Sequence, residues 1–176
     1  MFTQTLFKGF ILEAEIFVRT GTPDDVHGMM DLALAACEEN GLTRPNPEKL
    51  LHEIWSSLNL HHGIVGIIGE QGKPLEAAVL LRCEALWYSD DLVLNERAVF
   101  VAEPFRQAKG GRASKLIDFA VAAAQKLEMP LVVGVLSNQR TEGKVKMYGR
   151  KLGDASGAYW IVNGRTGKKS DDDEDN

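Results

Sequence analysis

The sequence predicts an α/β fold in which a mixed sheet is flanked by helices, and two observations support this prediction. First, the apolar patterns and turn residues divide the chain into elements in the order β-α-α-β-β-β-α-β-α-β, which combines a hairpin region with one strand-helix-strand crossover. Second, a length of 176 residues, with 44% hydrophobic and 26% charged residues, is ordinary for one soluble globular domain. We therefore expect one domain over residues 1–163.

The first predicted elements are a strand and two helices. Residues 15–19 (EIFVR) have the composition of a strand. The segment TPDD at residues 22–25 supplies a cap, a proline at the first helical position and acids in the first turn, so a helix begins there and ends at Gly41. The pair NP at residues 46–47 repeats this signal and predicts a helix over residues 47–58. The apolar face predicted for the first helix consists of Val26, Met29, Met30, Ala33, Leu34 and Cys37.

Three strands are predicted next. Residues 63–70 and 74–86 flank the turn QGK and form a hairpin, and residues 92–101 form a further strand after the loop WYSDD at residues 87–91. The loop combines aromatic and acidic side chains that suit a cationic amine. An ordinary hairpin loop explains it equally well.

The remaining predicted elements are two helices and two strands. A helix runs from Gly111 to about Leu127, because apolar side chains recur on one stripe of it. A buried strand over residues 129–136, a short helix over residues 141–153 and a last strand over residues 158–163 follow. Residues 164–176 end in the acidic run DDDEDN and have no apolar side chain with which to pack, so we expect a disordered tail.

A basic turn with paired glycines, FRQAKGGR at residues 105–112, leads directly into the helix that begins at Gly111. The first N–H groups of a helix are unpaired and its dipole makes that end partly positive, so anions bind there. Two glycines let a ligand approach the backbone, and the basic side chains suit phosphate. The turn therefore indicates a phosphate-bearing ligand, although a simple helix cap remains an alternative. Neither G-x-x-x-x-G-K-[ST] nor G-x-G-x-x-G is present.

The segment VFVAEPFRQAKGGRASKLI, residues 99–117, resembles the strand, loop and helix of the GNAT superfamily of N-acetyltransferases. That family binds the pyrophosphate of acetyl-CoA with a loop written Q/R-x-x-G-x-G/A, and Gly111 begins the G-x-G/A part here. Ala108 stands at the Q/R position, so Arg106, Gln107 or Lys109 takes that role.

A second segment, VKMYGRKLG at residues 145–153, resembles the late helix of the same family, L-Y-x-K-x-G-F, with Tyr148 at the tyrosine and Asp154 in place of the aromatic residue. The resemblance covers residues 15–162 and implies a mostly antiparallel sheet with splayed central strands. Asn138 falls at the split that admits the pantetheine arm. The sequence also resembles acetyltransferase-like proteins of phages and prophages.

The resemblance implies an enzyme that transfers acetyl from acetyl-CoA, its cosubstrate, to a primary amine by direct attack in a ternary complex. Such a reaction needs alignment of two substrates, a base, stabilisation of an oxyanion and an acid for the thiolate. Backbone groups of the strand 97–102 bind the pantetheine in this scheme. The residues predicted to bind the cofactor are Val99, Phe100, Val101, Arg106, Gln107, Lys109, Gly110, Gly111, Arg112, Ala113, Ser114 and Asn138.

Glu96 and Tyr148 are the predicted catalytic residues. Glu96 precedes the backbone that binds the cofactor, where the family often places a carboxylate base, and partial burial raises a carboxyl pKa toward neutrality. Tyr148 is a neutral phenol that can protonate the leaving thiolate. A surface glutamate and a core tyrosine are the alternatives. If neither residue is catalytic, the chain is a silent GNAT-like module that binds CoA or a host partner.

Composition restricts the partners and the location. The net charge of −5 argues against a general nucleic-acid binder, and no apolar run reaches the ~18 residues that a membrane span needs. Cys37 and Cys83 form no disulfide framework, which favours the cytoplasm. The adjacent His61 and His62 lack metal-ligand spacing, so no metal is expected. The acceptor is an amine of a small molecule or a protein, and a homodimer is left open.

Overall fold

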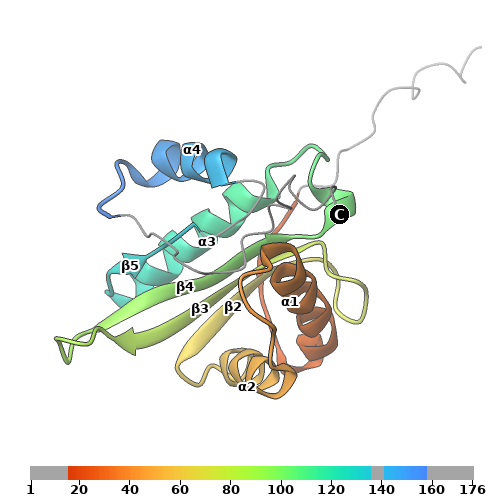
Figure 1. Cartoon of the computed structure of the whole chain (residues 1–176), viewed down its shortest axis with the longest axis horizontal. Helices are drawn as coiled ribbons and strands as arrows, with labels where there is room; N and C mark the ends of the chain where they lie inside the picture. The colour runs from red at the N-terminus through yellow and green to blue at the C-terminus, as the bar shows by residue number, and fades with distance from the viewer. Residues whose placement is uncertain (1–15, 136–140, 158–176) are drawn as a thin grey trace, which may run out of the picture.

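The computed structural model describes residues 16–135 and 141–157, and within them the chain forms a mixed, mostly antiparallel sheet flanked by helices, as predicted. The sheet order is β1-β2-β3-β4-β5, with antiparallel neighbours except for the parallel pair β4 and β5. Figure 1 shows α1 and α2 on one face of the sheet and α3 and α4 on the other. The strands are β1 (Arg19–Thr20), β2 (Gly63–Ile68), β3 (Ala77–Ala85), β4 (Leu92–Val101) and β5 (Leu131–Val132). The helices are η1 (Pro23–Asp25), α1 (Val26–Asn40), α2 (Pro47–Leu58), η2 (Glu103–Phe105), α3 (Arg112–Leu127) and α4 (Thr141–Leu152).

The element bounds agree with the prediction where local signals are strong. Helix α2 starts after Asn46, whose side chain accepts a hydrogen bond from the backbone N–H of Lys49 at 3.1 Å, and Pro47 occupies the first position. The predicted strand at residues 15–19 is wrong in its bounds, because among the described residues only Arg19–Thr20 pair with β2. The strand predicted over residues 129–136 is likewise limited to Leu131–Val132 and is only half-buried. Residues 158–163 and the tail lie outside the described residues.

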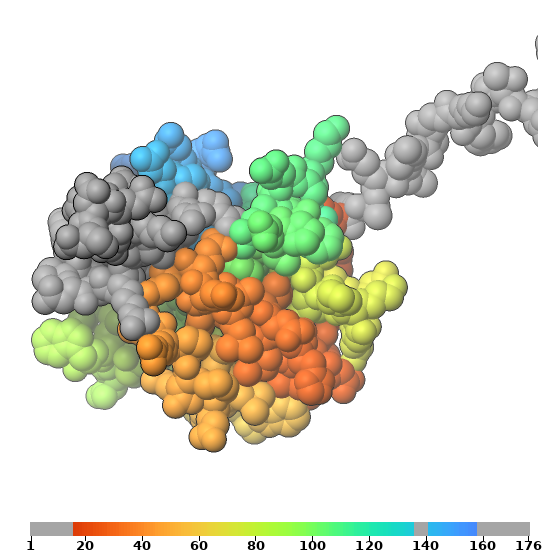
Figure 2. Space-filling view, turned by 45° about the vertical axis from the view of Figure 1, so that its right-hand side comes forward, coloured from red at the N-terminus to blue at the C-terminus, as the bar shows by residue number. Residues whose placement is uncertain are grey.

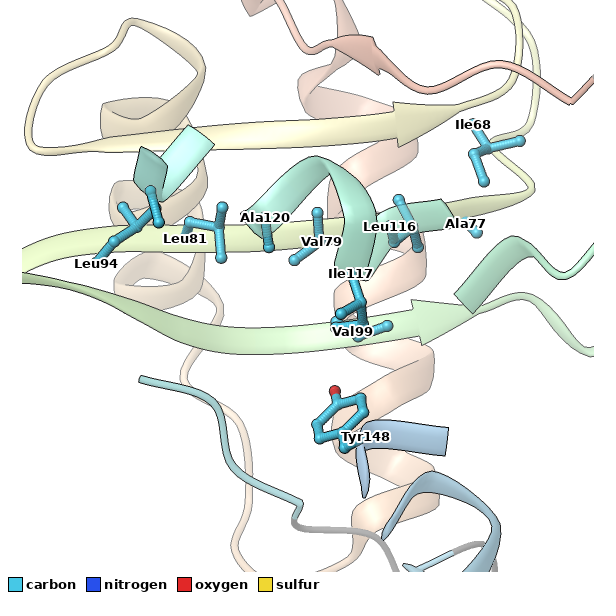
Figure 3. Close-up of a cluster of buried hydrophobic side chains, with 11 residues drawn as sticks. Ile68, Ala77, Val79, Leu81, Leu94, Val99, Leu116, Ile117, Ala120 and Tyr148 are labelled. Carbon is cyan, nitrogen blue, oxygen red and sulfur yellow. The ribbon is translucent and has the colours of Figure 1, made fainter. Parts of the chain in front are cut away.

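The side chains of α3 and the sheet form one of two hydrophobic clusters. Leu116, Ile117 and Ala120 on α3 are fully buried against Val79, Leu81, Leu94 and Val99 of the sheet. Figure 3 shows these side chains between α3 and the strands, with Tyr148 of α4 below β4. This cluster carries α3 and α4 on the face of β4 that holds the candidate site.

The second cluster lies under α1 and α2 and includes most of the apolar face predicted for α1, namely Met29 with Val26, Met30 and Ala33 packed against it. One position of that face is wrong. The structure buries Met29 and Leu32, whereas Leu34 is 36% exposed. A side chain at Gly28 would come within 2.8 Å of Cγ of Leu75, so this glycine allows Leu75 to pack against the helix. The buried face of α1 is therefore turned toward Gly28, which a count of apolar residues alone does not reveal.

Candidate active site

A cavity of about 870 Å³ lies between β4, the segment from η2 into α3, and α4. Val99, Phe100 and Val101 line it from β4, and Gly111 to Ser114 line it from the beginning of α3. Tyr148 lines it from α4. The cavity thus connects the two segments that the sequence singled out, the glycine turn and the tyrosine helix.

One edge of β4 opens into this cavity. β5 pairs with β4 only through Leu94 with Leu131 and Asn95 with Val132, and beyond them no described residue forms a strand next to β4 on that edge. The carbonyl oxygen of Val99 accepts a hydrogen bond from Nζ of Lys144 at 3.3 Å, and that of Val101 accepts one from Nε of Arg106 at 2.8 Å. The backbone on this edge therefore points toward side chains of the cavity rather than toward another strand.

A β-bulge in β4 determines which way Glu96 points. Leu80 and Leu81 are adjacent on β3, yet they pair with Ala98 and Glu96, so Arg97 is an extra residue. Glu96 lies opposite Leu81, whose side chain is buried in the α3 cluster. Without the bulge, simple alternation would place Glu96 and Val99 on opposite faces. With it, both point toward α3 and α4.

Glu96 and Tyr148 are in direct contact. The Tyr148 hydroxyl donates a hydrogen bond to Oε2 of Glu96 at 3.3 Å, and Tyr148 is 8% exposed. In Figure 3 the hydroxyl points toward β4 beside Val99. The structure therefore brings the two predicted catalytic residues together from elements that are far apart in the sequence.

Burial controls the electrostatics of this pair. It raises the pKa of Glu96, although the charge of Lys144 and hydrogen bonds from Tyr148 and from the backbone of Gly134 and Val99 act in the opposite direction. Burial also raises the pKa of Tyr148 well above that of an ordinary phenol, and the charge and hydrogen bond of Glu96 raise it further. Tyr148 is thus a protonated donor throughout the physiological range, and Glu96 is a carboxyl that binds a proton more readily than an exposed one.

The glycine turn presents backbone at the other end of the cavity. Gly110 and Gly111 have φ values of 114° and 58°, and Gly111 caps α3 without a side-chain hydrogen bond. A Cβ at Gly110 would lie 2.0 Å from Cδ1 of Ile16, whose side chain would have to move, and the φ of 114° favours glycine at this position. At Gly111 the added atom would meet only Ser114, at 3.7 Å. Gly111 leaves the first N–H groups of α3 accessible to an anion.

The two arginines of the turn are held by carboxylates. Nη2 of Arg106 lies 2.5 Å from Oε2 of Glu39 at the end of α1, and its guanidinium lies 5.1 Å from the ring centroid of Phe100. Nε of Arg112 lies 2.7 Å from Oε2 of Glu76, and its Nη1 donates to the carbonyl of Lys109 at 3.2 Å. Figure 2 shows the segment around η2 beside α1. Both arginines therefore brace the turn against neighbouring elements.

Several predicted residues lie elsewhere. Gln107, Lys109 and Gly110 belong to the turn but are not among the residues that line the cavity. Glu96 does not line it either and adjoins it through its contact with Tyr148. Asn138 is outside the described residues. Trp87 and Tyr88 are 95% and 67% exposed at the tip of the β3–β4 hairpin, at the opposite end of β4 from the turn. Their position favours an ordinary hairpin loop.

Sequence reasoning missed Lys144 and Glu39. Lys144 lines the cavity, donates a hydrogen bond to Val99 and lowers the pKa of Glu96. The sequence held a signal for it, because Lys144 lies four residues before Tyr148 and residues four apart share one face of a helix. Glu39 is joined to Arg106 across 67 positions, for which no local signal exists.

In residues 16–135 and 141–157 no group of three or more His, Cys, Asp or Glu side chains could hold a metal ion. No helix in these ranges is long and apolar enough to cross a membrane.

Comparison with known proteins assigns the fold. No protein family model matches the chain, and no curated protein sequence matches it. Among solved structures, a protein from Clostridium difficile 630 described as a possible acetyltransferase aligns over 84% of this chain and 96% of its own, with a TM-score of 0.62 and 14% identity. The chain therefore has the acetyltransferase fold that its resemblance to the GNAT superfamily predicts.

Two further solved structures have the same fold. The aminoglycoside N-acetyltransferase AAC(6')-Iy, in complex with CoA, aligns over 85% of this chain and 95% of its own, with a TM-score of 0.63 and 14% identity. A ribosomal-protein-alanine N-acetyltransferase from Brucella melitensis biovar Abortus 2308 aligns over 84% and 97%, with a TM-score of 0.59 and 16% identity. At these identities the likeness extends to the fold alone.

Proposed function

We propose that the protein is an N-acetyltransferase that transfers acetyl from acetyl-CoA to a primary amine by direct attack in a ternary complex. The observation that carries this proposal is the hydrogen bond between Glu96 of β4 and Tyr148, because Tyr148 lines the cavity that runs along the open edge of β4 to the beginning of α3. A carboxyl and a phenol with raised pKa values in direct contact are a typical acid–base arrangement.

The residues of the cavity fit acetyl-CoA, which supplies an acetyl group activated as a thioester. At one end, Gly111 and the N-terminus of α3 offer N–H groups to phosphate, and Arg112 stands beside them. At the other end, Val99 and Val101 direct backbone groups into the cavity. These two ends suit the pyrophosphate and the pantetheine arm, respectively.

Glu96 and Tyr148 take opposite parts in proton transfer. The Glu96 carboxylate takes a proton from the attacking amine, and its raised pKa makes it a better base than an exposed glutamate. Tyr148 donates a proton to the leaving thiolate. Because the charge of Glu96 raises the pKa of Tyr148, protonation of Glu96 removes that effect and makes Tyr148 a stronger acid. Acid and base are thus coupled in the order that the reaction requires.

Thiol release from acetyl-CoA, measured with a panel of amines, tests this proposal. Polyamines, aminoglycosides, amino acids and protein lysines cover the acceptor classes, and the fold is shared with an aminoglycoside and a ribosomal-protein-alanine acetyltransferase. Amine-dependent release that Tyr148→Phe reduces, and that Tyr88→Phe on the exposed hairpin tip does not, supports the function. A protein that fails to bind acetyl-CoA contradicts it.

A catalytically silent module that binds CoA or a partner protein is the second candidate. It is favoured by the carboxylates of Glu39 and Glu76, which already engage Arg106 and Arg112, the cations predicted for phosphate. CoA binding in calorimetry, without thiol release for any amine in the panel, would assign the protein to this class.

A further inference from the structure

Lys144 places a primary amine inside the candidate site. It lies on α4 one turn before Tyr148, is half-buried and lines the cavity. Its Nζ atom is 3.3 Å from the carbonyl oxygen of Val99, and its charge lowers the pKa of Glu96. The side chain therefore lies at the open edge of β4 and close to both proposed proton-transfer groups.

We propose that the ε-amino group of Lys144 is itself an acetyl acceptor, so that the protein acetylates its own Lys144. This inference rests on the proposed function, because acetyl-CoA is the donor. The amine lies on the same edge of β4 to which the acyl end of the donor is proposed to bind. Rotation about its side-chain bonds moves Nζ along this edge without any change in the backbone, and a held amine gains the rate advantage of proximity.

The atoms and electrons of the step balance within the site. Glu96 takes one proton from the Lys144 ammonium and passes it to solvent. The free amine then attacks, so that a bond forms between Nζ and the acetyl carbon while the C–S bond breaks and its electron pair goes to sulfur. Glu96 takes the second proton of the nitrogen, and Tyr148 protonates the thiolate and regains a proton from Glu96 through their hydrogen bond. The products are acetyl-lysine, CoA thiol and one released proton.

The same helix provides an internal control. Lys146 is two residues away, is exposed to solvent and does not line the cavity. Spontaneous acetylation by acetyl-CoA depends on accessibility and therefore favours Lys146 over the half-buried Lys144. Acetylation directed by the site has the opposite preference. The ratio of the two modifications distinguishes a directed reaction from a chemical background.

The experiment incubates the full chain with acetyl-CoA and no added amine, and follows acetylation at both lysines by peptide mass spectrometry over time. We expect Lys144 to be modified at least about tenfold faster than Lys146, because it is held at the donor site. The rate per molecule should not depend on protein concentration. Glu96→Gln should slow modification of Lys144 by about 10²-fold, the usual contribution of one positioned base, and leave Lys146 unchanged.

Three results would overturn the inference, and the first two leave the proposed function intact. Equal or slower modification of Lys144 relative to Lys146, in a protein that acetylates an added amine, excludes directed self-acetylation. A rate proportional to protein concentration indicates transfer between molecules. Absence of acetyl-CoA binding in calorimetry removes both this inference and the proposed function. The comparison of Lys144 with Lys146 is made in the unchanged protein, so it does not depend on whether a variant folds.

Discussion

The two ends of the cavity are built in different ways. At one end, Tyr148 lines the cavity and contacts Glu96, and burial is the largest cause of the raised pKa values of both groups. At the other end, the glycine turn offers backbone N–H groups, and its arginines pair with carboxylates that remain 23% and 29% exposed. Burial shifts the pKa values of the groups that transfer protons, whereas phosphate binding requires accessible hydrogen-bond donors. Substitutions at the two ends should therefore separate catalysis from binding.

The largest effect is expected for Tyr148→Phe. The change removes one hydroxyl and should reduce turnover by about 10²-fold to 10⁴-fold, the usual contribution of one positioned acid. Affinity for CoA should change little, because the turn is untouched. Steady-state kinetics together with calorimetry checks this. A parallel loss of affinity would contradict the separation of the two ends.

Glu96→Gln, at the same end of the cavity as Tyr148, should change how the turnover rate depends on pH. A base works when deprotonated, so the rate falls as pH decreases through the Glu96 pKa, and because that pKa is raised, the fall occurs at higher pH than the value of about 4.3 for an exposed glutamate. The variant should be slower by about 10²-fold and lack this acidic limb. Glu48→Gln on the exposed surface of α2 is the control. An unchanged limb in Glu96→Gln would assign it to another group.

Gly111→Asp should weaken CoA binding by about tenfold or more, since it sets a carboxylate against phosphate where charged hydrogen bonds contribute about 1.5–3 kcal/mol. An added Cβ there meets only Ser114 at 3.7 Å, and Asp adopts a φ of 58° more readily than most residues, so the protein should fold. Gly111→Asn separates charge from backbone strain, and Gly72→Asp, at a φ of 76° in open space, is the matched control. Equal affinities of Gly111→Asp and Gly72→Asp in calorimetry would argue against phosphate at this turn.

Arg112→Gln should have the smallest effect. It removes a partly exposed ion pair with Glu76, which contributes about 1 kcal/mol or less to stability. CoA affinity should fall less than in Gly111→Asp, because the backbone donors remain. Arg97→Gln, which breaks the more exposed pair with Glu84, is the control for chemical denaturation. A loss of CoA affinity larger than that of Gly111→Asp would make Arg112 the main phosphate ligand.

Local signals predicted most of the fold. The Asn46 cap and Pro47 set the start of α2, and the apolar run of residues 92–101 coincides with β4, because capping and periodicity act over a few residues. Tyr148 and Gly111 were also identified from short motifs, and both line the cavity. Glu96 was identified from its place ahead of the cofactor-binding strand, and it contacts Tyr148. Their chemical roles remain predictions.

Long-range packing decided what the sequence left open. Periodicity alone predicted Leu34 in the core, but Leu75 packs close to Gly28 and Leu32 is buried in the same cluster, whereas Leu34 is exposed. Simple alternation along β4 left open which face of the sheet the Glu96 side chain points to. The bulge at Arg97 settles this, because the register of β4 depends on its partner strand.

The sequence by itself determined the order of the elements, the glycine turn before α3 and the tyrosine of α4, since each follows from neighbouring residues. The tertiary structure alone decided that Tyr148 contacts Glu96, that Lys144 reaches Val99, and that Glu39 holds Arg106. These contacts join residues 52, 45 and 67 positions apart. The physical reason is that a side chain's neighbours across the cavity are set by how the sheet and helices pack, and no local pattern records that packing.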